Sequence, residues 1–322
     1  MLTKEVLDEE EIIRLIWGRI GSGKKDPFDD DVTWTLNTRK KLLVSKCDML
    51  VSFTDVSPGM TPAQIASKAM VSSVSDLAAK GVKPSHCLVS IGLPERLSTR
   101  SFVGGLAQGF REAEKKYKLK ILGGDTNATS SDVVIDVLIL GYSDKVIPRN
   151  EARPGDLVAV SGDFGLQSAG LLILSGKAKS TRTFKAIATK SVLRPRARLD
   201  LRNLVARRFA SCIDSSDGLA LSLYHLAESS KVDIELNRVP VANGVEEFAA
   251  NNKLSATELA LFGGEEYELV FTFDPVYAEE IKRQGLQIIG EVGRHVPPHA
   301  KPAVTLDSKK IPRRGWVHFA SH

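Results

Sequence analysis

The sequence breaks near its middle, at Asn150–Asp156, where a proline and a glycine interrupt a polar run. On both sides, short apolar runs typical of β-strands alternate with longer segments of helical periodicity. This alternation predicts an α/β (mixed α+β) chain with two domains, residues 1–150 and residues 151–322, and domains of about 100–200 residues are the usual size. Strands are expected at residues 32–36, 42–44, 87–93, 121–122, 133–140, 157–161, 233–236, 268–273 and 287–289.

The clearest helix signal begins at Thr61, which is followed by Pro62 and, three positions on, by Gln64. A capping threonine, a proline at the first helical position and a glutamine at the third form a typical helix start. This helix can continue to Lys80, with Gly81 as its stop. Further helices are expected at residues 4–17 and over about 18 residues ending near Tyr117.

Composition and charge exclude several classes of protein. No apolar run approaches the roughly 18 residues of a membrane span, and the acidic, amphipathic N-terminus is unlike a secretory signal. Three widely spaced cysteines indicate a reducing compartment, so we expect a cytoplasmic protein without zinc or disulfides. The net charge of +5 raises the question of nucleic acid. The basic cluster at residues 190–208 is better explained as a solvated helix face, and we expect neither nucleic-acid nor membrane partners.

Acidic residues stand beside glycine, serine or threonine at five places, each at an expected strand end or element boundary. Carboxylates that fold together repel one another unless a cation lies between them. Their hard oxygens suit Mg²⁺, which also binds phosphate. Aspartate is common in turns and helix caps, so each position alone has a structural explanation too. The five places are Asp29-Asp30-Asp31, Cys47-Asp48, Ser75-Asp76, Gly123-Gly124-Asp125-Thr126 and Asp214-Ser215-Ser216-Asp217-Gly218.

Two glycine-containing segments bear on phosphate binding. Gly123-Gly124 follows an apolar pair, and glycine lets backbone N–H groups approach a ligand closely, although it also marks tight turns. Gly18–Lys24 matches the first seven positions of a P-loop, but Lys25 stands where a magnesium-binding serine or threonine is required. The segment Gly18–Asp31 is therefore expected to be a loop. The sequence has no motif of a covalent nucleophile or of a zinc hydrolase.

Taken in order, these motifs resemble the thiamine-monophosphate kinases, a family in the superfamily of aminoimidazole ribonucleotide synthetase. The resemblance spans nearly the whole chain, and the ordered set of motifs is specific. It is carried by residues 29–32, 47–51, 69–84 (AMVSSVSDLAAKGVKP), 122–126 (LGGDT), 152–156 (ARPGD), 213–219 (IDSSDGL), 262–269 (FGGEEYEL) and 315–319 (GWVHF).

The resemblance implies a fold and a reaction. The family has two α/β domains per chain, and the N-terminal sheets pair across a homodimer. It transfers the γ-phosphoryl of ATP directly to thiamine monophosphate, giving thiamine diphosphate, and several Mg²⁺ ions neutralise charge without a protein nucleophile.

The resemblance also assigns roles to residues of this sequence. The metal positions are Asp31, Asp48, Asp76, Asp125, Asp214 and Asp217. The ATP positions are Gly124, Asp125, Arg149 and Ser216. The positions for thiamine monophosphate are Asp55, Glu265 and Trp316; a carboxylate and an aromatic ring suit a cationic thiazolium.

The sequence departs from the family pattern at several of these places. Lys46 and Cys47 replace hydroxyl residues before Asp48, Asp55 stands where many members have histidine, and Glu266 replaces an aspartate. Which two of the three aspartates at 29–31 match the family pair is left open. The alternatives are another ATP-dependent synthetase of the superfamily and a non-catalytic nucleotide- or RNA-binding relative.

Overall fold

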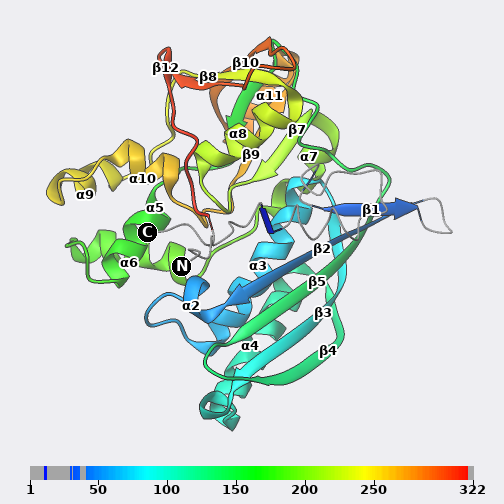
Figure 1. Ribbon diagram of the computed structural model, residues 1–322, viewed down its shortest axis with the longest axis vertical. Helices are drawn as coiled ribbons and strands as arrows, with labels where there is room; N and C mark the ends of the chain where they lie inside the picture. The colour runs from blue at the N-terminus through cyan, green and yellow to red at the C-terminus, as the bar shows by residue number, and fades with distance from the viewer. Residues whose placement is uncertain (1–10, 13–29, 31, 37–40, 318–322) are drawn as a thin grey trace, which may run out of the picture.

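The N-terminal half is built on a five-stranded sheet in the order β1-β2-β5-β3-β4 (Figure 1). The computed structural model describes residues 11–12, 30, 32–36 and 41–317. All neighbouring strands are antiparallel except β3 and β4, which run parallel. The strands are β1 (Thr33–Leu36), β2 (Leu42–Val51), β3 (Lys83–Pro94), β4 (Lys120–Thr129) and β5 (Val134–Ser143).

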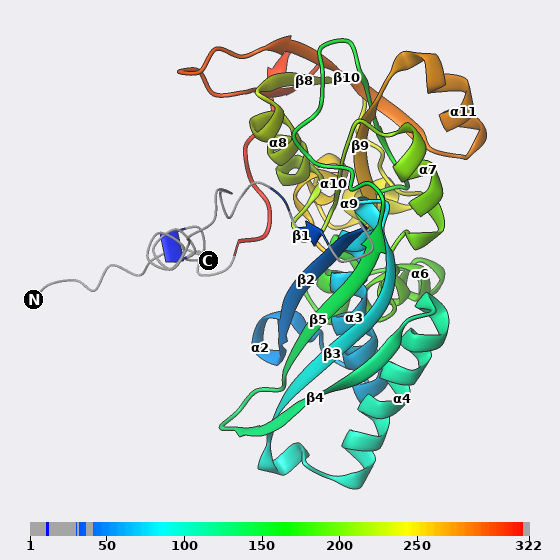
Figure 2. The same cartoon turned by 90° about the vertical axis from the view of Figure 1, so that its right-hand side faces the viewer.

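Two long helices, α3 (Pro62–Ala79) and α4 (Arg100–Tyr117), cover one face of this sheet (Figure 2). The predicted capping box is confirmed: the Thr61 side chain accepts from the Gln64 N–H, and the Gln64 side chain accepts from the Thr61 N–H. Most side chains of α3 are buried because the helix packs on the sheet, on α4 and on the C-terminal half. The short helix α2 (Ser52–Asp55) directly follows β2.

The opposite face of the N-terminal sheet carries large apolar side chains that are exposed in this chain. Met49 of β2 is 63% exposed, Leu122 of β4 is 64% exposed, and Leu88 and Tyr142 are also exposed. Side chains alternate between the two faces of a strand, and residues paired across strands share a face. The face away from α3 and α4 is therefore partly apolar, and these four side chains on it are exposed.

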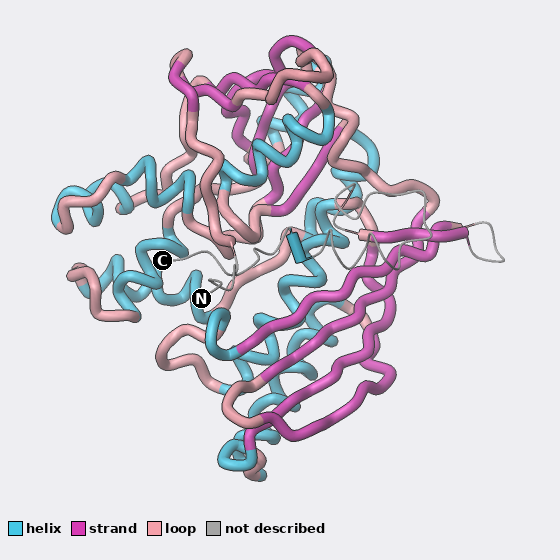
Figure 3. The backbone as a smooth tube through the Cα atoms, in the orientation of Figure 1, coloured by secondary structure: helices cyan, strands magenta, loops and turns pink. Residues whose placement is uncertain are grey.

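The C-terminal half holds a seven-stranded mixed sheet in the order β12-β11-β8-β10-β6-β9-β7. Its strands are drawn in magenta in the upper part of Figure 3. Its strands are β6 (Leu157–Val160), β7 (Ser211–Asp214), β8 (Val232–Leu236), β9 (Leu269–Phe273), β10 (Gln287–His295), β11 (Val304–Leu306) and β12 (Lys309–Lys310). Its helices are α5 (Leu166–Leu174), α6 (Arg182–Leu193), α7 (Arg202–Arg208), α8 (Leu219–Ser230), α9 (Val245–Asn251), α10 (Ala256–Phe262) and α11 (Ala278–Arg283). Single 3-10 turns are η1 (Glu95–Leu97), η2 (Leu199–Leu201) and η3 (Pro275–Tyr277).

The two halves pack against each other along α3. Ala79 belongs to the same buried cluster as Phe271 of β9, and Tyr267 belongs to the core of the N-terminal half. The fully buried Lys80, at the end of α3, donates to the Cys212 carbonyl oxygen of β7 at 2.8 Å. This contact places the end of α3 beside the end of β7, where the aspartate motif 214–217 begins.

The two-domain α/β fold class is confirmed, while the boundary after residue 150 stays a prediction. Several strands are longer than expected, and one difference matters: β4 runs through LGGDT to Thr129, so Asp125 lies within a strand and not at a strand end. The ladder to β3 holds these residues in place. Of the expected helix 4–17 and loop 18–31, only residues 11, 12 and 30 are among those described. None of the described helices is long and apolar enough to span a membrane.

Candidate active site

A cleft with an empty volume of about 520 Å³ lies between the two halves and is lined by half of the predicted site residues. One wall comes from β2, α2 and α3, and the other from the loops at 215–217 and 263–267 with the C-terminal segment. Its lining includes Asp48, Met49, Leu50, Asp55, Lys68, Ser72, Ser216, Asp217, Glu265, Tyr267 and Trp316.

Backbone hydrogen bonds join the segments that form the C-terminal wall. The N–H of Glu265 donates to the Ser216 carbonyl at 2.5 Å, and the N–H of Trp316 donates to the Asp217 carbonyl at 2.9 Å. Glu265 and Tyr267 have positive φ angles of 65° and 54°. Non-glycine residues adopt such angles at a cost of about 1–3 kcal/mol, and these conformations concentrate at ligand sites. The loop thus holds the Glu265 side chain toward the cleft.

Lys68 carries a positive charge beside Glu265 and Asp55 in the cleft. It is only 3% exposed, and its Nζ lies 2.5 Å from Glu265 Oε1 and 2.5 Å from the Asp55 carbonyl oxygen. The Asp55 carboxylate accepts from the Val51 N–H at 2.7 Å and so ties the end of α2 to the end of β2. Glu265 is therefore ion-paired within the chain, and Asp55 has a structural role in addition to its predicted one.

Asp48 and Asp76 meet at a second lysine. Lys46 Nζ lies 3.0 Å from Asp48 Oδ1 and 2.9 Å from Asp76 Oδ2, so the ammonium bridges β2 and α3. The side chain of Asp76 is 9% exposed and those of Lys46 and Asp48 are partly buried. These two carboxylates lie close together with a lysine between them, and their role as metal ligands stays a prediction.

A third lysine holds one residue of the 29–31 aspartates. Lys80 Nζ lies 2.7 Å from Asp30 Oδ1, and both side chains are buried. Asp31, which the sequence assigned to metal, lies outside the described residues. Asp30 therefore forms an ion pair with the lysine that follows the C-terminal end of α3.

Asp214 ends β7 as a buried carboxylate on the inner side of the cleft. Burial raises the pKa of the Tyr267 phenol well above its usual value, and the carboxylates of Glu265, Asp214, Asp48 and Asp55 raise it further. Four acidic groups from both halves therefore act on the same buried phenol. Tyr267 stays neutral and supplies a hydroxyl among these charges.

Asp125 lies apart from this group. Across the sheet it stands in one row with Ser90 of β3, Asp136 of β5 and Met49 of β2. The side chains of this row lie on the open face of the sheet. Asp48 belongs to the next row, which faces α3. Gly124 pairs with Val89 in that inner row, and a Cβ there would lie 1.7 Å from the Val89 carbonyl oxygen, so close strand packing requires glycine.

Arg149 is buried in the segment between the two sheets, with its carbonyl oxygen accepting from the Ser230 hydroxyl at 3.3 Å. Its predicted contact with ATP phosphates stays a prediction. Ser216, by contrast, lines the cleft directly next to Asp217.

The donor groups suit Mg²⁺ that is shared with a ligand. In the part of the chain that the structure describes, no three acidic, histidine or cysteine side chains are grouped so as to hold a metal alone. Asp48 Oδ2 is buried without a hydrogen-bond partner among those residues, which leaves a hard oxygen available to a cation. Mg²⁺ is usually bound by one or two carboxylates, water and substrate phosphate, and these residues fit that mode.

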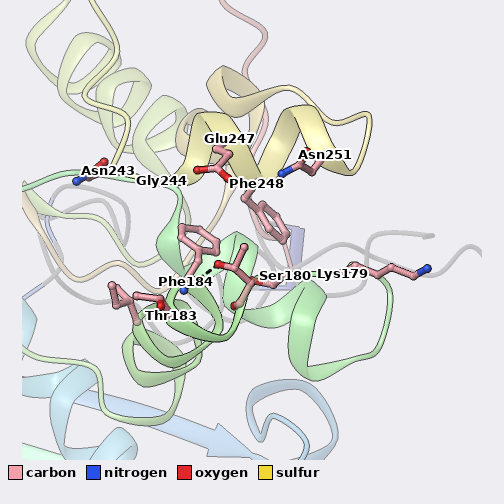
Figure 4. Close-up of a pocket in the computed structure, with 11 residues that line it drawn as sticks. Lys179, Ser180, Thr183, Phe184, Asn243, Gly244, Glu247, Phe248 and Asn251 are labelled. Carbon is pink, nitrogen blue, oxygen red and sulfur yellow. Dashed lines mark hydrogen bonds between the residues drawn. The ribbon is translucent and has the colours of Figure 1, made fainter.

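A larger pocket, with about 650 Å³ of empty volume, lies between α6 and α9 in the C-terminal half (Figure 4). Its centre is the stacked pair Phe184 and Phe248, whose ring centroids are 5.2 Å apart. Glu247 is the only carboxylate among its lining residues. Its lining lacks the grouped carboxylates of phosphoryl-transfer chemistry, so the smaller cleft is the candidate active site.

Sequence reasoning missed Lys68, Lys80 and Tyr267 as members of the site. A signal was present for Lys68, which stands among the apolar positions Ile65, Ala69 and Met70 of its helix. A buried lysine needs a charged or polar partner. The identity of that partner could not be predicted, because it comes from a distant segment.

Comparisons with known proteins agree with the motifs. Residues 28–143 match the family described as AIR synthase related protein, N-terminal domain. The thiamine-monophosphate kinase of Nitrosopumilus maritimus is 38% identical over 318 residues, 97% of this chain and 99% of the relative. That of Pyrococcus abyssi is 34% identical over 97% of this chain and 96% of the relative.

Solved structures give the same answer for the fold. AaThiL complexed with AMPPCP and TMP superposes with a TM-score of 0.88 at 30% identity, covering 99% of this chain and all of that one. The chain therefore belongs to the thiamine-monophosphate kinase family, within the AIR synthase-related proteins.

Proposed function

We propose that the cleft transfers the γ-phosphoryl group of ATP directly, in line, to the phosphate of thiamine monophosphate. As a family member the chain is an ATP-dependent thiamine-phosphate kinase. The observation that supports this location is the convergence of Asp48, Asp217, Glu265 and Trp316, from both halves of the chain, on one cavity. The relative complexed with an ATP analogue and TMP shares this fold over its whole length.

The acidic residues would hold Mg²⁺ ions against the phosphates. Asp48, Asp76, Asp214 and Asp217 lie on the cleft or just behind it, and the proposed set also contains Asp31 and Asp125. When bound, Mg²⁺ neutralises charge on the phosphoryl oxygens, which is the main requirement of this reaction. The chain's own contribution is to position both phosphates and to exclude water.

The thiamine end of the substrate would lie at Trp316 and Glu265. The Trp316 side chain lines the cleft and is 41% exposed, which leaves surface for a cationic ring to stack. Lys68 holds the Glu265 carboxylate in one position, so the substrate cation meets an already oriented acid. Asp55 lines the same end of the cleft. Gly124, Asp125, Arg149 and Ser216 are the proposed ATP contacts.

A second copy of the chain would complete the site. Asp125 lies on the open face of the sheet, turned away from Asp48, so within one chain it cannot join the acidic group. The exposed apolar residues Met49 and Leu122 make the same face suitable for pairing with another copy. In a two-fold dimer, each Asp125 would serve the partner's site.

The reaction itself is the direct test. The protein is incubated with thiamine monophosphate, ATP and Mg²⁺, and thiamine diphosphate is measured by chromatography. Product should form, should stop in EDTA and should return with added Mg²⁺. Absence of product together with tight RNA binding on filters would favour the non-catalytic alternative instead.

The dimer has its own test. Light scattering should give about 70 kDa, twice the 35.0 kDa of the chain. Mixing inactive Asp125→Asn and Asp217→Asn chains should restore about a quarter of the wild-type activity in a random exchange, because half of the dimers then hold one intact site. A monomer mass, or no recovery on mixing, contradicts the shared site.

A further inference from the structure

Lys46 occupies the position between two of the proposed metal-binding carboxylates. Its ammonium nitrogen lies 3.0 Å from Asp48 Oδ1 and 2.9 Å from Asp76 Oδ2. The side chains are 20%, 25% and 9% exposed for Lys46, Asp48 and Asp76, so water screens these contacts only in part. Two strand residues and one helix residue thus form a carboxylate–ammonium–carboxylate bridge at the edge of the cleft.

An ammonium group and a divalent ion cannot both occupy this bridge. Mg²⁺ requires oxygen ligands at about 2.0–2.1 Å in near-octahedral geometry. The ammonium already lies at hydrogen-bond distance from one oxygen of each carboxylate, and lysine presents its charge as a compact point with three donors. A divalent ion that bridged these same two oxygens would have to displace Lys46.

We infer that Lys46 is a resident cation of the active site, which takes the place of one divalent ion between Asp48 and Asp76. This rests on the proposed role of these two aspartates in holding metal. The second oxygen of Asp48, Oδ2, makes no hydrogen bond to any described residue and stays available to an ion on the phosphate side. Lys46 is thus a positioning residue: it keeps both carboxylates in place before nucleotide and metal arrive.

A second lysine, Lys80, neutralises another aspartate close to this bridge. Lys80 pairs with Asp30 at 2.7 Å in a fully buried position, one helical turn after Asp76 on α3. Asp30, Asp48 and Asp76 together carry three negative charges, and the two lysines supply two positive ones. The chain therefore balances most of this charge itself, and the fold should need little metal for its stability.

Metal counting tests the inference. Binding of Mn²⁺ is titrated by the EPR signal of the free ion, in the presence of a non-hydrolysable ATP analogue, on wild type and on Lys46→Ser. The serine variant should bind one more Mn²⁺ per chain. Lys46→Arg, which keeps a cation, should retain the wild-type number, as should Lys41→Ser, which removes a lysine paired with an exposed aspartate at 3.6 Å.

Thermal melting gives a readout that is independent of turnover. In EDTA, Lys46→Ser should melt below wild type, because Asp48 and Asp76 then repel each other. Added Mg²⁺ should raise the melting temperature of Lys46→Ser more than that of wild type. If Lys46→Ser does not fold in EDTA, the number of bound Mn²⁺ ions is compared between Lys46→Arg and wild type. The two proteins should bind equal numbers of ions, and a higher number for Lys46→Arg overturns the inference.

The opposing results are distinct. The inference is overturned if Lys46→Ser binds the same number of Mn²⁺ ions as wild type and Mg²⁺ raises the two melting temperatures equally. It is also overturned if Lys46→Ser loses nucleotide binding measured without metal, because Lys46 would then be a phosphate contact. These measurements do not use product formation. If wild type makes thiamine diphosphate and Lys46→Ser gains no ion, only the role of Lys46 is refuted. If wild type is inactive, the proposed function is refuted.

Discussion

Replacement of Lys68 by methionine should destabilise the protein strongly, although the two side chains have similar volumes. The change removes a buried ammonium that lies 2.5 Å from Glu265 Oε1 and 2.5 Å from the Asp55 carbonyl oxygen. Glu265 then keeps its negative charge beside Asp48 and Asp214, the carboxylates that share the surroundings of Tyr267. The loss is therefore one of charge balance and not of packing.

The magnitude follows from the geometry. Breaking a buried ion pair from one side costs about 3–5 kcal/mol, because the remaining charge has no partner. The Glu265 side chain is 26% exposed, so water recovers part of this loss, while the broken bond to the Asp55 carbonyl adds about 1 kcal/mol. We expect a destabilisation of about 3 kcal/mol, which for a chain of 322 residues corresponds to a decrease in melting temperature of about 4–5 °C.

A double-mutant cycle measures the pair itself. The double variant Lys68→Met with Glu265→Gln removes both charges and should recover to within about 1 kcal/mol of wild type in urea unfolding, since a buried pair is replaceable by neutral groups. The exposed pair Lys282 and Glu279 is the control and should give a coupling energy below about 0.5 kcal/mol. A coupling energy of Lys68 with Glu265 as small as that of the control would refute the reasoning.

Three further predictions follow from the site. Asp217→Asn and Asp125→Asn should each lower ADP release by about 100-fold or more, with apo melting temperature level or higher; near-normal turnover in both would count against the metal cluster. Burial raises the pKa of Glu266 from 4.5 to about 8, so between these pH values the folded state retains a proton that the unfolded state releases. The melting temperature should therefore fall as the pH rises from about 4.5 to about 8, and Glu266→Gln should flatten this pH profile. Burial and the neighbouring Asp136 raise the pKa of Cys47 to about 11. This thiol should therefore react with iodoacetamide at about pH 7.5 far more slowly in wild type than in Asp136→Asn, and equal rates would contradict the assignment.

Local signals in the sequence were sufficient for α3 and for the end of α4, and the ordered motifs were sufficient for the family. The capping box at Thr61 formed as predicted, and α4 ended at Tyr117. Gly218 stands directly before α8, at one of the expected element boundaries. These features depend on residues within one or two turns of each other, so the chain's local chemistry is enough to determine them.

Strand ends and sides were decided by pairing. The glycines before Asp125 suggested the end of a strand, yet β4 continues because its ladder with β3 extends to Thr129. The same register places Asp125 on the open face and Asp48 on the inner one. A side chain's face depends on its register with a neighbouring strand, and register is a property of the whole sheet.

The charge balance of the site was likewise decided only by the tertiary structure. The sequence predicted that several aspartates would gather around metal, and it placed Glu265 at the substrate. It did not predict that Lys46, Lys68 and Lys80 would turn toward these acids, because the partner of each lysine depends on how distant segments pack. Contacts such as that from Lys80 to Cys212 span 132 positions, and only the packing of the two halves brings such groups within hydrogen-bond distance.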